Sequence, residues 1–181
     1  MTEDDVVVAV YAHHENAEEA VRELQRAAFD IKKLSIVGKD YHTEEHVVGY
    51  YNAGDRMKYW GTLGGFWGGF WGLLFGAAFF AVPGIGAVLA AGPLVGWIVS
   101  ALEGALVVGG VSAIGAGLYS IGIPKDSILR YDAALEASKF LLIAHDTADE
   151  ITRAREIISR TAAEEVNLYS SQAPQPVGSA A

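Results

Sequence analysis

The chain contains no cysteine, and this absence excludes several kinds of site. Disulfide bonds, thiolate nucleophiles and cysteine-ligated zinc or iron–sulfur centres all require that residue. Lysine and arginine are also scarce, with 13 basic residues against 22 acidic ones and no basic cluster. Nonspecific binding to nucleic acid depends on basic side chains that replace phosphate counterions. The composition therefore argues against a nucleic-acid partner.

Charge is nearly absent from the middle of the chain. Within residues 59–123, Glu103 is the only Asp, Glu, Lys or Arg, whereas residues 1–58 carry 7 basic and 12 acidic side chains and residues 124–181 carry 6 and 9. The acidic first residues are unlike a secretory signal peptide. We divide the chain into two halves of one α/β domain (1–58 and 124–169), a hydrophobic block (59–123) and a tail (170–181) expected to be disordered.

The two charged halves show the patterns of strands and amphipathic helices. In the first half, Asn16 followed by Glu19 predicts the start of a helix, and Thr147 with Glu150 repeats that spacing in the second half. The predicted elements are a strand at 6–12, a helix at 16–28, a strand at 34–37 that 47–51 extends or pairs with, a helix at 124–137, a strand at 140–144, a helix at 147–161 and a strand at 166–169. This order favours an α+β fold, a split-βαβ (ferredoxin-like) sandwich.

A short repeat suggests a candidate ligand site. The run that begins at His14 and Glu15 aligns with the run that begins at His145 and Asp146, each between a predicted strand and a predicted helix. If the first and third strands are adjacent and parallel, both histidines lie at one sheet edge beside helix N-termini, which favour anions. With Glu15 and Asp146 they could instead bind a divalent metal. The alternative is that all four residues are structural or solvated. We predict no cofactor.

The hydrophobic block is long enough for two membrane-spanning helices, at 60–82 and 94–119. Breaks are expected around Pro83–Gly86 and at Gly92-Pro93. A shared sheet requires the chain to leave and return on the same side of the bilayer, so two crossings are expected. The basic residues flank the block. These features predict an inner-membrane protein with both termini in the cytoplasm.

Small residues recur in the block with helical spacing, as in helices that pack closely in lipid. In the second span the series comprises alanines and glycines four residues apart. Such series predict self-association, so we expect a homo-oligomer. The glycines assigned to helix packing are Gly61, Gly64, Gly65, Gly68, Gly69, Gly72, Gly76, Gly109 and Gly117.

Glu103 would lie close to the bilayer midplane in the second span, where a carboxylate is costly and is commonly functional. One interpretation is a protonatable or cation-contacting group. The other is a tilted or re-entrant hairpin in which Glu103 reaches an interface or stays protonated.

Several segments resemble a family of small bacterial proteins known as general-stress or heat-induced stress proteins, many of them predicted membrane proteins. The similarity is carried by Tyr59-Trp60-Gly61, by the run from Gly64 to Gly68, by Pro83–Gly86 and by the run from Ser120 to Ser127, and it covers about 55–160. The resemblance implies a stress-associated membrane protein and supplies no catalytic residue.

These features lead to three functional hypotheses. The first is a non-enzymatic, stress-associated membrane protein that self-assembles through its glycine-rich helices, with the α/β domain as a cytoplasmic sensing or assembly module. The second is a small ion or proton channel or carrier that uses Glu103. The third is a soluble homo-oligomeric scaffold that buries the apolar hairpin. The sequence shows no nucleophile–base pair or cofactor motif that would favour an enzyme.

Overall fold

An antiparallel sheet of six strands, in the order β3-β4-β2-β5-β1-β6, organises the part of the chain that the computed structural model describes, residues 4–39, 77–82, 85–103 and 112–170. Every neighbouring pair of strands is antiparallel. The elements are β1 (Asp5–Tyr11), α1 (His14–Arg26), the short 3-10 helix η1 (Ile31–Lys33), β2 (Leu34–Lys39), β3 (Ala77–Val82), β4 (Gly86–Ala91), α4 (Pro93–Glu103), α5 (Ala113–Ser120), α6 (Lys125–Glu136), β5 (Phe140–Asp146), α7 (Ala148–Ile158) and β6 (Glu165–Tyr169).

The two charged halves interleave within this sheet. Strand β5 lies between β1 and β2, and β1 lies between β5 and β6. Strand β5 thus separates the two strands of the unit β1–α1–β2, and strand β1 separates the two strands of the unit β5–α7–β6. The α+β class is confirmed, and these four strands have the order expected of a split-βαβ sandwich.

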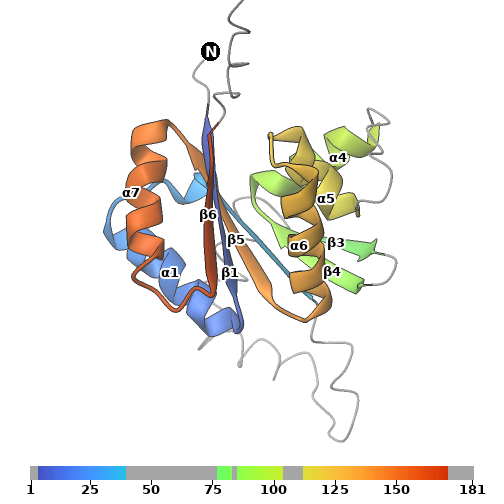
Figure 1. The fold of residues 1–181 in the computed structure, drawn as a ribbon, viewed down its shortest axis with the longest axis horizontal. Coiled ribbons are helices and arrows are strands. Elements are labelled where there is room, and N and C mark those ends of the chain that lie inside the picture. The colour runs from blue at the N-terminus through green and yellow to red at the C-terminus, as the bar shows by residue number, and fades with distance from the viewer. Residues whose placement is uncertain (1–3, 40–76, 83–84, 104–111, 171–181) are drawn as a thin grey trace, which may run out of the picture.

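Helices cover both faces of the sheet, as Figure 1 shows. Alternate residues of a strand point to opposite faces, and β1 is buried along its whole length. Val7, Ala9 and Tyr11 belong to the core under α1 and α7. Their neighbours Val6, Val8 and Val10 belong to a second core, under α4, α5 and α6. We call these two sides the α1/α7 layer and the α4/α5/α6 layer.

The first predicted membrane span does not continue as a helix through its last residues. Residues 60–76 lie outside the described part of the chain, but Ala77–Val82 form strand β3. The predicted break at Pro83–Gly86 falls between the paired strands β3 and β4, where Val82 pairs with Gly86 and Ile85 N donates to Val82 O at 3.1 Å. Strand β4 then pairs with β2. This stretch widens the sheet.

The second predicted span is divided between two shorter helices. The break at Gly92-Pro93 is present, α4 has 11 residues, and α5 has 8 and packs against α4. No helix in the described ranges is long and apolar enough to cross a membrane. Their buried side chains, among them Leu94, Ile98, Ile114 and Leu118, are part of the core against the sheet. An apolar composition suits a protein core as well as lipid, and here it fills the core.

The predicted capping pattern is wrong in detail. Helix α1 begins at His14, two residues before Asn16, and its N-cap residue His13 makes no side-chain capping bond. Thr147 is the N-cap residue of α7 but also makes none. The sequence repeat therefore aligns positions that are not equivalent, because His14 lies in a helix and His145 in a strand.

Candidate functional site

His14 and His145 do not form one site. The prediction placed β1 and β5 parallel, but they are antiparallel, with Val6 opposite His145 and Tyr11 opposite Phe140. His14 follows the Tyr11 end, where its ring lies 6.1 Å from that of Phe140. At ~3.4 Å per strand residue the two histidines are separated by about 20 Å. A ligand that bridges both cannot bind within this chain.

The two carboxylates proposed beside the histidines are separated in the same way. Glu15 lies in the first turn of α1, and Asp146 ends β5, where its Oδ1 accepts a hydrogen bond from Thr147 N at 2.8 Å. No group of three or more metal-ligating side chains is found among the described residues. The predicted divalent-metal set therefore has no geometry to support it.

His145 has an unusual environment of its own. Its ring stands edge-to-face against Trp97 of α4, with the ring centroids 4.7 Å apart, and its Nδ1 is buried without a hydrogen-bond partner. Burial lowers the pKa of His145, and Lys33 lowers it further, while Asp4, a backbone hydrogen bond with Lys33 and Asp146 act in the opposite direction. His145 thus joins the end of β5 to α4 as a neutral ring.

We expect His145 to make the fold less stable in mild acid. The pKa of His145 in the folded state lies below the ordinary value of 6.5, so the unfolded chain takes up a proton first as the pH falls. The contribution of the neutral ring to the stability of the fold is therefore complete above pH 6.5 and is lost as the pH falls from there through the folded pKa. Urea unfolding at pH 7.5 and 5.5 measures the effect. His145→Phe keeps an aromatic ring beside Trp97 and should reduce the difference between the two pH values. An unchanged difference in His145→Phe would show that other groups cause it.

Glu103 is not buried in the middle of a span. It is the last residue of α4, and its side chain is exposed. The carboxylate therefore meets solvent at a helix end, and the structure gives no support to a conduction pathway built around it.

The glycines assigned to helix packing divide into two groups. Gly117 of α5 lies against Ile98 of α4, since a Cβ added to it would be 2.5 Å from Ile98 Cγ1, so its small size has a packing role inside one chain. The others lie outside the described residues, namely Gly61, Gly64, Gly65, Gly68, Gly69, Gly72, Gly76 and Gly109.

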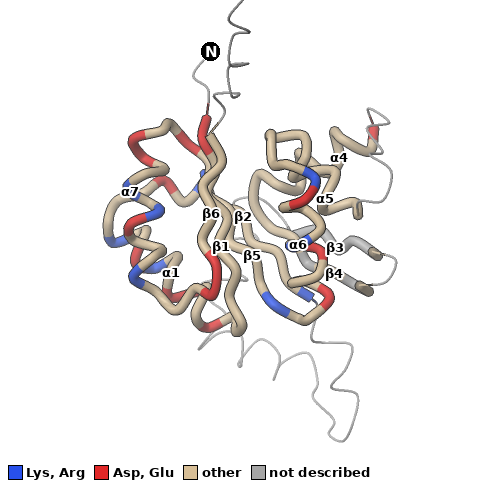
Figure 2. The backbone as a smooth tube through the Cα atoms, viewed as in Figure 1, with Lys and Arg blue, Asp and Glu red and all other residues tan. Residues whose placement is uncertain are grey.

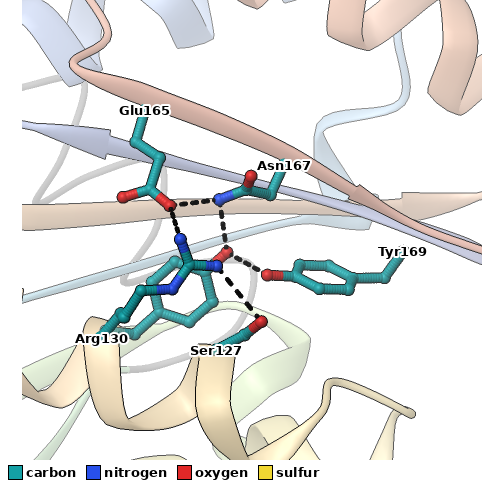
Figure 3. A network of polar contacts seen from close by, with 6 residues as sticks. Ser127, Arg130, Glu165, Asn167 and Tyr169 are labelled. Atoms are coloured by element: carbon teal, nitrogen blue, oxygen red, sulfur yellow. Dashed lines mark hydrogen bonds and ion pairs between the residues drawn. The ribbon is translucent and has the colours of Figure 1, made fainter.

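A polar network joins α6 to strand β6, and sequence reasoning missed it (Figure 3). Tyr131 Oη and Tyr169 Oη are 2.7 Å apart, and Asn167 Nδ2 donates to Tyr131 Oη at 3.2 Å. The same amide donates to Glu165 Oε1 at 2.6 Å, and Arg130 Nη1 pairs with that oxygen at 2.9 Å. A weaker contact links Arg130 Nη2 to Ser127 Oγ. The side chains of Glu165, Asn167 and Tyr169, on the face of β6 toward α6, thus all take part in hydrogen bonds.

The chemistry of this network is structural. Burial raises the pKa of Tyr131, and its hydrogen bond with Tyr169 raises it further, so the phenol stays neutral as a donor or acceptor. A signal was present in the alternation of Glu165, Asn167 and Tyr169, which places three polar groups on one face of a strand. Their partners on α6 are more than 30 positions away and carry no matching motif.

Two shallow depressions lie on the α1/α7 layer. One, of about 500 Å³, lies between α1 and α7 and mixes acidic and basic side chains such as Glu19, Glu23 and Arg26. The other, of about 350 Å³, lies beside β6 and is lined by Thr152, Arg155, Glu156, Ser159, Arg160 and Leu168. The hydroxyls of Thr152 and Ser159 donate to the backbone carbonyls of Ala148 and Arg155 and not to a carboxylate.

The outward side of α4 exposes two large apolar side chains, next to the exposed Gly96, Ser100 and Glu103. Val99 and Leu102 are 42% and 47% exposed, and their spacing of three residues places them on one face of the helix, which we call the α4 outer face. Tyr119 of α5 is also exposed, at 43%. Figure 2 shows the contrast, since the α1/α7 layer is dense in charge, whereas α4 and α5 are almost free of it. The sequence indicated the lack of charge but not this exposure.

Comparison with known proteins identifies one region. Residues 6–80 match the family model described as the heat induced stress protein YflT domain. The match covers less than half of the chain, including β1, α1, β2 and part of β3. No curated protein and no solved structure matches the chain. The association with stress is thus supported, from a region that shares only residues 55–80 with the resemblance described above.

Proposed function

We propose that this chain is a non-enzymatic, stress-associated protein that binds membrane surfaces through the α4 outer face. The match at residues 6–80 supports the association with stress. The observation that carries the membrane proposal is the exposed pair Val99 and Leu102 on a helix whose only charged residue is Glu103, at its end. The polar clusters in the described parts of the chain are packing contacts, which favours binding over catalysis.

The charge distribution indicates which surface would meet lipid. The α1/α7 layer carries charged side chains along both helices, and burying them in lipid would be costly. Helices α4 and α5 have only Glu103. An interfacial helix places its apolar face about 5–10 Å into the boundary between headgroups and acyl chains, with charged groups kept outside. Glu103 follows Leu102 at the end of this face, so its carboxylate would lie among the polar headgroups while Val99 and Leu102 enter that boundary.

The contribution of these two side chains to binding can be estimated. Full burial of a valine or leucine side chain contributes about 1.5–3 kcal/mol, and each of these is a little under half exposed. Covering the remainder of both contributes roughly 1–3 kcal/mol in total. Since ~1.4 kcal/mol corresponds to a tenfold change in affinity, the pair should affect binding measurably.

The double variant Val99→Asp/Leu102→Asp should therefore bind vesicles at least about tenfold more weakly than the parent chain. Flotation of the full chain with phosphatidylcholine vesicles measures the bound fraction. Leu129→Asp is the matched control, because Leu129 is 46% exposed on α6 but has charged neighbours, and its binding should be unchanged. Equal flotation of all three proteins would contradict a role for the α4 outer face.

Vesicle charge provides a second test. The chain has a net charge of −9, so vesicles that contain phosphatidylglycerol should repel it and bind less than neutral ones, and added salt should reduce that difference. Tighter binding to the anionic vesicles would indicate an electrostatic mode instead of the apolar one.

A further inference from the structure

Strand β6 forms one end of the sheet in the described parts of the chain, and its outer edge is suited to receiving another strand. It pairs with β1 on one side only. Its five residues, Glu165 to Tyr169, include no lysine or proline, two residues that commonly protect sheet edges from pairing. Its single charge, on Glu165, is already paired with Arg130.

The polar network between α6 and β6 holds this strand in place. Glu165, Asn167 and Tyr169 are each hydrogen-bonded on the α6 side, directly or through one another (Figure 3). The opposite side presents Val166, half-buried against α7, and Leu168, which is 36% exposed. An edge that is already ordered loses little conformational entropy when a second strand pairs with it.

We propose that the occupant of this edge is the β6 strand of a second copy of the chain, in antiparallel register about Asn167. A two-fold axis perpendicular to the sheet keeps each face of the sheet continuous, so a residue must pair with one on the same face. Centring on Asn167 uses all five residues of the strand. The pairs are then Glu165 with Tyr169, Val166 with Leu168, and Asn167 with itself.

This register is favourable for the side chains on both faces. On the α7 side, Val166 of each copy contacts Leu168 of the other copy, so the exposed leucine of each copy is covered. On the α6 side, Glu165 faces a tyrosine, so no like charges oppose each other. The depression beside Leu168, between β6 and α7, has room for the partner's side chains. A register centred on Glu165 would instead place two carboxylates opposite each other and use fewer residues.

The oligomeric state tests the proposal directly. Light scattering coupled to size exclusion should show the full chain as a dimer at micromolar concentration. Leu168→Lys places a charge at the centre of the apolar pairs and should weaken dimerisation at least tenfold, whereas Leu129→Lys on α6 should leave it unchanged. A monomer in the parent chain, or a dimer that is insensitive to Leu168→Lys, would overturn the proposal.

A crosslink can identify the register. The chain has no cysteine, so Asn167→Cys introduces a single thiol in each copy. Opposed residues of an antiparallel pair have Cα atoms about 4.5–5.5 Å apart, within the range of a disulfide bond. Under oxidation this variant should form a covalent dimer rapidly, while Glu165→Cys should not, because its two copies would be ~14 Å apart. Equal crosslinking at both positions would indicate random collision and overturn the register.

The proposed dimer and the proposed membrane binding can be contradicted independently of each other. The lysine variant of Leu168 lies on β6 and leaves Val99 and Leu102 untouched. Loss of dimerisation with unchanged flotation, or the reverse, distinguishes the two surfaces.

Discussion

Replacing Gly92 with alanine should destabilise the fold by about 3 kcal/mol or more. Gly92 joins β4 to α4 with φ of +98°, a conformation that strains any residue with a Cβ. A Cβ added there would lie 2.3 Å from Leu34 O and 2.8 Å from Ser35 Cα, both of which are backbone atoms of β2. These atoms cannot rotate away, so strand β2 or the start of α4 must move.

Gly86 provides a matched control for this prediction. Its φ of +102° is almost the same, but an added Cβ would meet nothing within 4 Å. Gly86→Ala should therefore show only the backbone strain, about 1–2 kcal/mol. Urea unfolding followed by circular dichroism measures both variants. If the two alanines cost the same, the contact between Gly92 and β2 contributes nothing.

The second large effect is expected at the contact between α4 and α5. A Cβ on Gly117 would lie 2.5 Å from Ile98 Cγ1 and 3.2 Å from the Ile98 backbone, so Gly117→Ala should force the helices apart at a cost of about 1–3 kcal/mol. Gly96 lies in α4 with open space around it, and Gly96→Ala should stabilise the protein by about 0.5–1 kcal/mol, because alanine favours helices.

The same unfolding measurement compares these two variants. Opposite signs are expected for the same chemical change in two adjacent helices. If Gly117→Ala also stabilises the protein, helix propensity outweighs packing, and the close approach of α5 to α4 is wrong.

The charged halves could be predicted because their strands and helices have clear periodicities. The run from Val6 to Val10 is too β-branched for a helix, and α1 places Ala17, Val21 and Leu24 on one face. Element order then limited the topology. Boundaries were less certain, since His13 supports the start of α1 through its backbone without a capping side chain.

The hydrophobic block could not be predicted in the same way. Continuous apolar sequence is compatible with a lipid environment and with a core on a sheet, and periodicity does not separate the two. The decisive information is tertiary, in the pairing of β4 with β2 and the packing of Ile98 and Leu118 in the core. Small residues at four-residue spacing do indicate close helix contact, as Gly117 shows, but they do not identify the partner.

The candidate sites depended on strand direction and on distant partners. One wrong assumption, that β1 and β5 are parallel, brought His14 and His145 together. Conversely, the contact of His145 with Trp97 and the network around Tyr131 join elements far apart in sequence. Neither has a spacing that a single sequence reveals.

The interleaved order of the strands also determines when the sheet can form during synthesis. Strand β1 is made first, yet both of its neighbours, β5 and β6, are made last, the nearer pairing being Tyr11 with Phe140. At a translation rate of ~5–20 residues per second, roughly ten seconds pass between the synthesis of the valine-rich β1 and that of its partner β5. A nascent chain that ends before β5 has β1 and β2 without the strand between them. Translation must therefore pass Asp146 before the centre of this fold can form.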